Sequence, residues 1–268
     1  MQIIILGANG MLGSMMRYVG HKQNLNILPL GRSQYDALCE DTKSLMRFFT
    51  KDCCVVNCIG AIPQKKYEDC QFMRLNTEFP IELASLCATH KVPLVHISTN
   101  CVFSGTSPMC CESDTPDATD MYGLSKSRGE PSNCVVLRCS IIGPEINSAF
   151  GLFEWFLNSQ NTVKGFTDHY WNGLTTLELA NFVYSIIKER SFYPRLQHCY
   201  SETVVSKNDL LHNISNLFAK KISITPVSNG TKYYTLSSNY SGSSKHIYEQ
   251  LKELWGVLHE YRAFARTI

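Results

Sequence analysis

The sequence predicts an α/β fold, with a doubly wound parallel sheet followed by a smaller C-terminal lobe. Short β-rich runs alternate with helical stretches over the first two thirds of the chain, which is the order that a parallel sheet requires. The runs are apolar without interruption, as in residues 3–6 (Ile-Ile-Ile-Leu), which indicates strands covered on both faces. A glycine-rich turn follows the first run, as expected at the ligand-binding edge of such a sheet.

The boundary signals define the elements one by one. The expected strands are residues 2–6, 26–30, 54–58, 94–98 and 134–139. Asp41 is an N-cap for an expected helix over 42–49, and another helix over 82–90 follows Pro80. In the second part of the chain, helices are expected over 176–188 and over 243–261. Another helix is expected to start at the capping-box-like pair Ser206 and Asp209.

Composition and charge favour one two-lobed unit that binds a small ligand. The chain has 268 residues, 44% of them hydrophobic, which suffices for a full core. Its 25 Lys and Arg against 23 Asp and Glu leave a formal charge of +2, and no long basic run offers a nucleic-acid or membrane surface. The N-terminus lacks a signal-peptide pattern, and no run of about 18 apolar residues predicts a membrane span. We therefore expect a cytoplasmic protein with no nucleic-acid or membrane partner.

The 12 cysteines do not have the spacing of a disulfide framework or a zinc site, because no C-x-x-C pair occurs. Cys54, Cys58, Cys134 and Cys139 lie in apolar strand-like runs, where a reduced thiol behaves as a small hydrophobic group. We expect buried free thiols and no metal site.

The turn after the first strand has the pattern of a dinucleotide-binding loop. Gly7, Gly10 and Gly13 follow the strand in the spacing G-x-x-G-x-x-G, and a helix is expected to begin at about Met11. Glycines allow the tight turn, the approach of a pyrophosphate to the backbone and the packing of the helix against the strand. The helix N-terminus then faces the phosphates. The context of strand, turn and helix favours this interpretation over an ordinary turn.

The end of the second strand favours NADP over NAD. An NAD site usually has an acidic residue here to bind the ribose hydroxyls, whereas this chain has Arg32. A guanidinium can make paired hydrogen bonds to a 2′-phosphate, and Arg17 is a second candidate for this contact. The alternative is a solvated surface arginine, since Asp36 is close in sequence.

A Tyr/Lys pair supplies candidate catalytic groups. Tyr122 and Lys126 have the Y-x-x-x-K spacing that places both side chains on one helical face. Three other tyrosines also have a lysine four positions on, but Tyr122 lies between the fourth and fifth expected strands, 23 residues after Thr99 at the end of the fourth. We expect Lys126 to lower the pKa of the Tyr122 phenol. Tyr122 would then protonate a carbonyl oxygen while Thr99 donates a hydrogen bond to it.

These residues, taken in order, resemble the dTDP-4-dehydrorhamnose reductase family of extended short-chain dehydrogenases. The resemblance covers roughly residues 1–190 and is carried by 97–105 (Ile-Ser-Thr-Asn-Cys-Val-Phe-Ser-Gly), 122–126, Gly129-Glu130, 136–138 with Gly143, the glycine turn and 56–58. It implies an NADPH-dependent oxidoreductase that reduces the 4-keto group of a UDP- or dTDP-linked 4-keto-6-deoxyhexose in the biosynthesis of rhamnose-like sugars. By analogy, a homodimer is common for this fold.

The resemblance also implies the residues of the site. The catalytic set is Thr99, Tyr122 and Lys126, and the last two also contact the cofactor. Further cofactor contacts are expected from Gly7, Asn9, Gly10, Met11, Leu12, Gly13, Arg32, Cys58, Ile59 and Gly60. Residues 151–157 and 171–178 resemble a nucleotide-sugar reductase subgroup, and the expected substrate contacts are Asn100, Val102, Trp171 and Asn172; for Trp171 the alternative is a core aromatic. We expect an NADP-binding Rossmann-like domain over 1–145 and a substrate-binding lobe over 146–268, with some segments returning to the first domain.

Two departures from the family pattern bear on the substrate. The family commonly has Asp after the catalytic Thr, whereas this chain has Asn100. Near 233–236 we would expect an arginine that holds the nucleotide diphosphate, and Lys232 is the substitute that the sequence offers.

Two other functions compete with reduction. One is an epimerase or dehydratase of the same family. A dehydratase needs an extra acid and base beside the tyrosine, and Asn100 cannot titrate in that role. The other is a non-catalytic, NADP-binding regulatory subunit, against which the retention of Thr99, Tyr122 and Lys126 argues.

Overall fold

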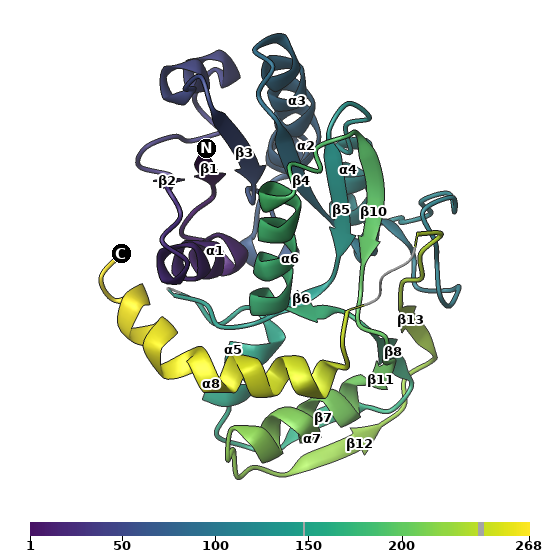
Figure 1. Ribbon diagram of the computed structural model, residues 1–268. Helices are drawn as coiled ribbons and strands as arrows, with labels where there is room; N and C mark the ends of the chain where they lie inside the picture. Colours follow the sequence, from purple (N-terminus) through teal and green to yellow (C-terminus); the bar gives the residue numbers. More distant parts are fainter. Residues whose placement is uncertain (147, 241–243) are drawn as a thin grey trace.

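The computed structural model describes residues 1–146, 148–240 and 244–268, and it has the expected α/β architecture (Figure 1). Six parallel strands form the central sheet. In spatial order they are β10 (Arg195–Cys199), β5 (Val135–Cys139), β4 (Leu94–Thr99), β3 (Cys53–Asn57), β1 (Gln2–Leu6) and β2 (Ile27–Leu30). The strand order reverses between β1 and β3, and ligands bind beyond the strand ends at such a switch point.

Helices cover both faces of this sheet. Alternate residues of β1 point to opposite faces, so Ile3 and Ile5 join one buried cluster and Ile4 and Leu6 join the other. The first face packs against α1 (Met11–Lys22) and α6 (Thr176–Lys188), and the second against α2 (Asp69–Met73), α3 (Phe79–Thr89) and α4 (Met121–Arg128). Figure 1 shows these two layers on either side of the sheet. The α/β class and its doubly wound sheet are therefore confirmed.

Two expected helices differ from the structure. Residues 42–48 form the 3₁₀ helix η1 (Thr42–Phe48), although Asp41 caps it as expected by accepting the Lys43 backbone N–H at 2.9 Å. The helix expected over 82–90 extends much further back, because α2, a π-helical turn η3 (Arg74–Glu78) and α3 follow one another without a break. Pro80 lies near the start of α3 and has no N–H to donate to the carbonyl of Asn76, four residues earlier. The wider π turn accommodates the missing hydrogen bond, so Pro80 does not start a new helix as we expected.

The second part of the chain forms a lobe of small sheets and also returns to the central sheet through β10 (Figure 1). Its three-stranded sheet has β8 (His169–Trp171) between β11 (Val205–Ser206) and β13 (Lys232–Tyr234). Two further pairs are β7 (Val163–Phe166) with β12 (Ile224–Val227), and β6 (Ile141–Ile142) with β9 (Leu174–Thr175). The lobe also contains α5 (Leu152–Asn158), α7 (Lys207–Leu217) and α8 (Ile247–Ala265). The domain division at residues 145/146 stays a prediction.

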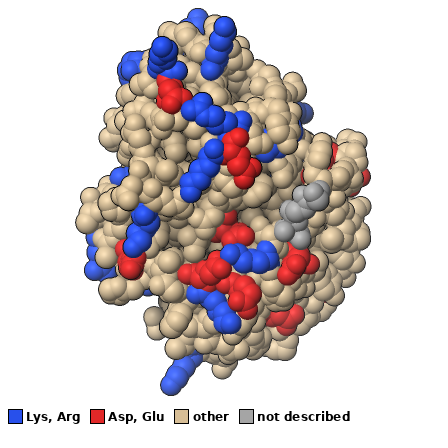
Figure 2. Space-filling model, in the orientation of Figure 1, with Lys and Arg blue, Asp and Glu red and all other residues tan. Residues whose placement is uncertain are grey.

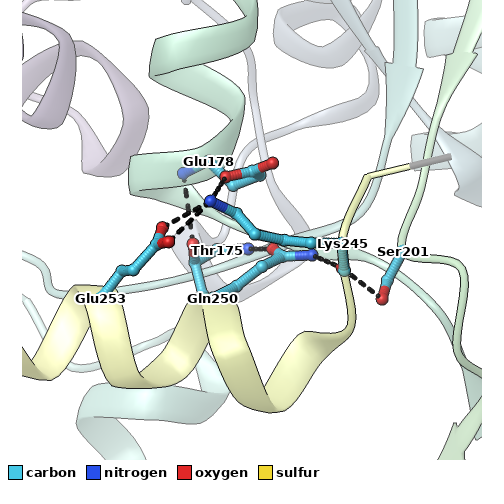
Figure 3. Close-up of polar contacts among 6 residues, drawn as sticks. All are labelled: Thr175, Glu178, Ser201, Lys245, Gln250 and Glu253. Carbon is cyan, nitrogen blue, oxygen red and sulfur yellow. Dashed lines mark hydrogen bonds and ion pairs between the residues drawn. The ribbon is translucent and has the colours of Figure 1, made fainter. Parts of the chain in front are cut away.

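The C-terminal helix is joined to the rest of the molecule by a polar cluster that is buried at Gln250 and exposed at Lys245 and Glu253 (Figure 3). Gln250 on α8 is fully buried; its side chain accepts the backbone N–H of Thr175 at 2.9 Å and donates to the Lys245 carbonyl at 2.7 Å. The Lys245 ammonium lies between Glu178 on α6, at 3.2 Å, and Glu253 on α8, at 2.7 Å. The expected start of this helix at Ser243 lies outside the described residues.

The described part of the surface carries charges of both signs. Figure 2 shows lysines and arginines interspersed with acidic side chains on the viewed face. Within the described ranges, no helix is both long and apolar enough to cross a bilayer. In the same residues, no group of three or more His, Cys, Asp or Glu side chains is placed to hold a metal ion.

Candidate active site

A cleft of about 790 Å³ opens at the carboxyl ends of the central strands. One wall consists of the segments that follow β1, β3, β4 and β5, and we call it the sheet wall. The facing wall, which we call the lobe wall, consists of residues from β8, β13 and α7: Trp171, Tyr234, Lys207 and Leu210. Residues from the segment that leads into α5, among them Glu145 and Phe150, also line the cleft.

The glycine turn forms the first part of the sheet wall. Gly7 has φ +71°, a conformation that favours glycine, and its carbonyl accepts the Gly10 N–H at 2.9 Å. A Cβ on Gly13 would lie only 2.3 Å from the Gly7 carbonyl oxygen, so α1 packs closely against the turn. Of the expected cofactor contacts in this turn, Asn9, Gly10, Met11 and Leu12 line the cleft, whereas Gly7 and Gly13 shape it from behind.

The segment after β3 forms the next part of the sheet wall, with Cys58, Ile59 and Gly60 facing the cleft as expected. Two buried asparagines that we did not foresee hold it. The Asn57 side chain accepts the Ile59 N–H at 3.0 Å. Asn76 in the π turn accepts the Ala61 N–H at 2.8 Å and donates to the Ser125 hydroxyl at 3.0 Å. Asn76 thereby connects this segment to the helix that carries the Tyr/Lys pair, and a π turn inside a helix is a frequent marker of a functional site.

Arg32 lies outside the cleft lining, and its side chain is 64% exposed. Its guanidinium is 3.7 Å from the Asp36 carboxylate and donates to the Tyr67 hydroxyl at 3.2 Å. Arg17 instead donates to the Asn9 side chain, at 2.7 Å, and so supports the glycine turn. Arg32 therefore has the environment of a surface arginine, and its contact with a 2′-phosphate stays a prediction.

Thr99, Tyr122 and Lys126 all line the same part of the cleft. Thr99 ends β4, and Tyr122 and Lys126 lie one turn apart on α4, whose N-terminus is capped by Asp120. Burial raises the pKa of the Tyr122 phenol above its ordinary value, and a side-chain hydrogen bond with Thr99 acts in the opposite direction. The net shift is upward, opposite to the one we expected from Lys126, because desolvation of the phenolate dominates.

Lys126 is almost completely buried, and its ammonium donates to the Ile97 carbonyl at 2.8 Å. Desolvation lowers its pKa to about 8, although the nearby Glu130 carboxylate acts to raise it. Glu130 is held by Arg138 on β5 through two short contacts, Nε to Oε1 at 2.9 Å and Nη2 to Oε2 at 2.7 Å, and it also accepts the Ser98 hydroxyl. This buried ion pair fixes the end of α4 to β4 and β5, beneath Thr99 and Lys126.

Two of the four expected substrate contacts line the cleft, one on each wall. Trp171 lines the cleft and is 5% exposed, and its indole N–H donates to the Ser140 hydroxyl at 2.8 Å. It is therefore both a packed aromatic and a cleft residue. Asn100 also lines the cleft, and its amide donates to the Tyr234 carbonyl at 3.1 Å, which joins the sheet wall to the lobe wall.

The other two expected substrate contacts do not line the cleft. Val102 is fully buried in a small hydrophobic cluster with Phe103, Cys110 and Leu236. Asn172 is 2% exposed, and its amide forms a reciprocal pair with the backbone of Leu236, donating at 2.8 Å and accepting at 2.9 Å. Both residues are corrections to the sequence analysis: they were assigned from local resemblance, and their side chains are used for packing.

The cleft also contains groups that the sequence analysis missed. Lys232, the expected substitute for a diphosphate-binding arginine, does not line it, whereas Lys207 does. Ser206 signalled the start of α7, but nothing in the local sequence indicated that the first residue of this helix faces the cleft. Ser140, Tyr234 and the 3₁₀ turn η2 (Pro63–Lys65) are further lining residues of this kind.

Comparison with known proteins places this geometry in a family. The model of the family described as RmlD substrate binding domain matches residues 1–261. The chain belongs to this family. The resemblance seen in the sequence is thereby confirmed, since curated relatives named dTDP-4-dehydrorhamnose reductase also match.

Members of known structure share the whole fold. A dTDP-4-dehydrorhamnose reductase from Bacillus anthracis, solved in complex with NADP, superposes with a TM-score of 0.82 at 18% identity, covering 95% of this chain and 98% of that chain. A dTDP-4-dehydrorhamnose reductase from Clostridium acetobutylicum superposes with a TM-score of 0.80 at 22% identity, covering 97% of this chain and 100% of that chain.

Among curated relatives, the dTDP-4-dehydrorhamnose reductase of Sinorhizobium fredii is 30% identical over 133 residues, which is 48% of this chain and 45% of the relative. The matched region therefore spans about half the length of this relative. Membership in the family rests on the match over residues 1–261.

Proposed function

We propose that this protein is an NADPH-dependent reductase of the 4-keto group of a nucleotide-linked 4-keto-6-deoxyhexose. The observation that carries the proposal is the meeting of Thr99, Tyr122 and Lys126 in one cleft with the glycine turn. These side chains come from β4 and α4 and line the same cleft as the glycine turn, where we propose that the dinucleotide binds.

The sheet wall fits the cofactor in shape. Gly7, Gly10 and Gly13 have no side chains to cover the turn at their own positions, and a Cβ on Gly60 would be 4.0 Å from the Lys126 ammonium. We propose that Asn9 to Leu12 hold the pyrophosphate at the N-terminus of α1 and that Cys58 to Gly60 border the cofactor further along. NADPH, when bound, supplies the hydride that goes to the carbonyl carbon of the substrate.

The residues of this chain supply the proton and orient the carbonyl. Tyr122 retains its proton at neutral pH, since a phenol has an ordinary pKa of about 10 and burial raises it further, so a neutral phenol is present to protonate the carbonyl oxygen. The Thr99 hydroxyl donates a hydrogen bond to the same oxygen as negative charge develops there. The Lys126 ammonium stabilises the phenolate that remains after the proton has left.

The substrate class rests on the family and on the size of the cleft. Relatives that share the fold are named for reduction of dTDP-4-dehydrorhamnose, and one was solved with NADP. A volume of about 790 Å³ suits a large ligand. We propose a UDP- or dTDP-linked 4-keto-6-deoxyhexose as substrate, a preference for NADP over NAD through Arg32, and a role in the biosynthesis of rhamnose-like sugars. A homodimer and a cytoplasmic location stay predictions.

The proposal is tested by mixing the purified protein with NADPH and either a dTDP- or a UDP-4-keto-6-deoxyhexose and following the absorbance of the reduced nicotinamide. Consumption of NADPH with the formation of a 6-deoxyhexose is the expected result. Epimerisation of a sugar nucleotide without net consumption of NADPH would favour the epimerase instead. NADPH binding without turnover of either substrate would favour the regulatory subunit.

A further inference from the structure

The lobe wall contains a lysine to which no role has been assigned. Lys207 is the first residue of α7, and its ammonium lies 4.6 Å from the centre of the Tyr234 ring. Both residues line the cleft. Within the described ranges, the Lys207 ammonium makes neither an ion pair nor a hydrogen bond. The lysine is therefore a cation with an aromatic neighbour and no described counter-charge.

The three-stranded sheet determines where this lysine lies. β8 is the central strand, and its Trp171 pairs with Val205 on one side and with Tyr234 on the other. Lys207 follows β11 directly, so its side chain enters the cleft from one edge of the sheet while Tyr234 enters from the other. Trp171 lies between them. The wall thus has a cation beside an aromatic ring, in the same cleft as Thr99 and Tyr122.

The surroundings of Lys207 favour an anion. Burial lowers the pKa of its ammonium, which reflects the loss of hydration in the cleft. A partly desolvated cation without a counter-charge is unfavourable until an anion binds to it. The N-terminal end of α7 adds a positive partial charge at the same position. Glu145, an acidic residue that also lines the cleft, instead accepts the Gly151 N–H at 3.0 Å.

The other lysines near the cleft are less suited to this anion. Lys126 donates to the Ile97 carbonyl and belongs to the catalytic set. Lys65 lies in η2, which follows the segment that borders the cofactor. Lys232 lies outside the lining, so the substitute suggested by sequence position is not available.

We propose that Lys207 binds the diphosphate of the nucleotide sugar, taking the place of the arginine that this chain lacks near residues 233–236. The proposal rests on the proposed function, because it requires a nucleotide-linked substrate in this cleft. It places the sugar between the catalytic groups of the sheet wall and the diphosphate at the lobe wall. As a point charge with three donors, the ammonium can bind either phosphate without the fixed fork geometry of a guanidinium.

The test is a titration of the NADPH-bound protein with UDP and with dTDP, followed by calorimetry. In Lys207→Met we expect the Kd of the diphosphate that the wild type prefers to rise by at least about tenfold, the scale of a lost charged hydrogen bond. Lys207→Arg should retain most of the affinity, and Lys232→Met serves as the matched control with wild-type affinity. Lys207→Gln provides a second neutral variant if the Met variant folds poorly. The Kd for NADPH should be unchanged in all four variants.

The outcomes separate this proposal from the function on which it rests. If the wild type binds a nucleoside diphosphate and reduces the keto sugar, but Lys207→Met and Lys207→Gln bind as tightly as the wild type, the assignment of Lys207 is wrong. It is also wrong if these variants bind UDP and dTDP normally and lose only affinity for the complete sugar nucleotide. If the wild type binds neither nucleoside diphosphate and reduces neither keto sugar, the proposed function itself fails.

Discussion

The two walls of the cleft are built in different ways. The sheet wall consists of the residues that follow successive parallel strands, so their order in the chain already indicates that they meet at one edge. The lobe wall depends on β11, β8 and β13, which are paired across more than thirty residues of intervening chain on the β11 side and about sixty on the β13 side. The comparison indicates that the chemistry of a site is easier to locate from the sequence than its substrate selectivity.

The largest expected effect is at the sheet wall. Tyr122→Phe removes the proposed proton donor, and we expect kcat to fall by about 10²- to 10⁴-fold, the usual contribution of general acid catalysis. The change leaves the ring in place, so NADPH affinity should remain. Tyr170→Phe on β8 is the matched control, since this tyrosine stacks on Tyr233 outside the cleft lining. Wild-type turnover by Tyr122→Phe, measured by NADPH absorbance, would show that the proton comes from another group.

A second prediction tests the close packing of the glycine turn. The Cβ of Gly13→Ala would lie 2.3 Å from the Gly7 carbonyl oxygen, so α1 must shift away from the turn. Overpacking of this kind costs about 1–3 kcal/mol, and we expect NADPH affinity to fall by about 5- to 150-fold. Gly256→Ala on the exposed side of α8 meets no atom within 4 Å and should leave binding unchanged. Fluorescence titration with NADPH measures both, and equal affinities would contradict a close turn.

The third prediction concerns the support of the lobe wall. Asn172→Ala removes both hydrogen bonds to the Leu236 backbone and leaves its buried N–H and carbonyl unpaired. We expect a loss of about 1–3 kcal/mol in the free energy of unfolding, measured by urea denaturation. Asn26→Ala, at an exposed position whose side chain makes no hydrogen bond within the described residues, should change it by less than about 0.5 kcal/mol. If Asn172 instead bound substrate, the variant would keep its stability and lose only substrate affinity.

The smallest effect is a pH dependence that arises from Lys126. Its pKa of about 8 means that the ammonium loses its charge as the pH rises through that value. Since kcat/KM reports the ionisation of the free enzyme, we expect it to fall above pH 8 and approach a tenfold decrease per pH unit. The Glu130 carboxylate raises this pKa, so Glu130→Gln should move the alkaline limb to lower pH. An unchanged limb in that variant would assign the ionisation to a different group.

The sequence predicted those parts of the fold that depend on local signals. The helix expected over 176–188 is α6 with the same bounds, because its apolar residues repeat at helical spacing and Thr175 caps it. Ser206 caps α7 as expected. The helical segment before residue 79 was missed, since Pro80 indicated a boundary that the π turn removes.

The candidate site also has a part that local sequence signals predicted and a part that they did not. Thr99, Tyr122, Lys126 and the residues that follow β1 and β3 line one cleft because each comes directly after a parallel strand or lies on the short helix between two of them. Val102 and Asn172 have suitable neighbours in sequence, but their side chains point into packed regions. The sequence alone did not show that these two side chains are buried whereas Lys207 lines the cleft, because this depends on how the strands of the lobe pair.

The sequence by itself determined the parallel sheet, the glycine turn and the candidate catalytic groups, because these depend on short-range patterns and on the order of the strands. The tertiary structure decided which lysine lines the lobe wall of the cleft, whether Arg32 is exposed and which way the pKa of Tyr122 shifts. These properties depend on burial and on contacts between residues far apart in the chain. Burial and long-range contacts exist only after the two lobes have packed together.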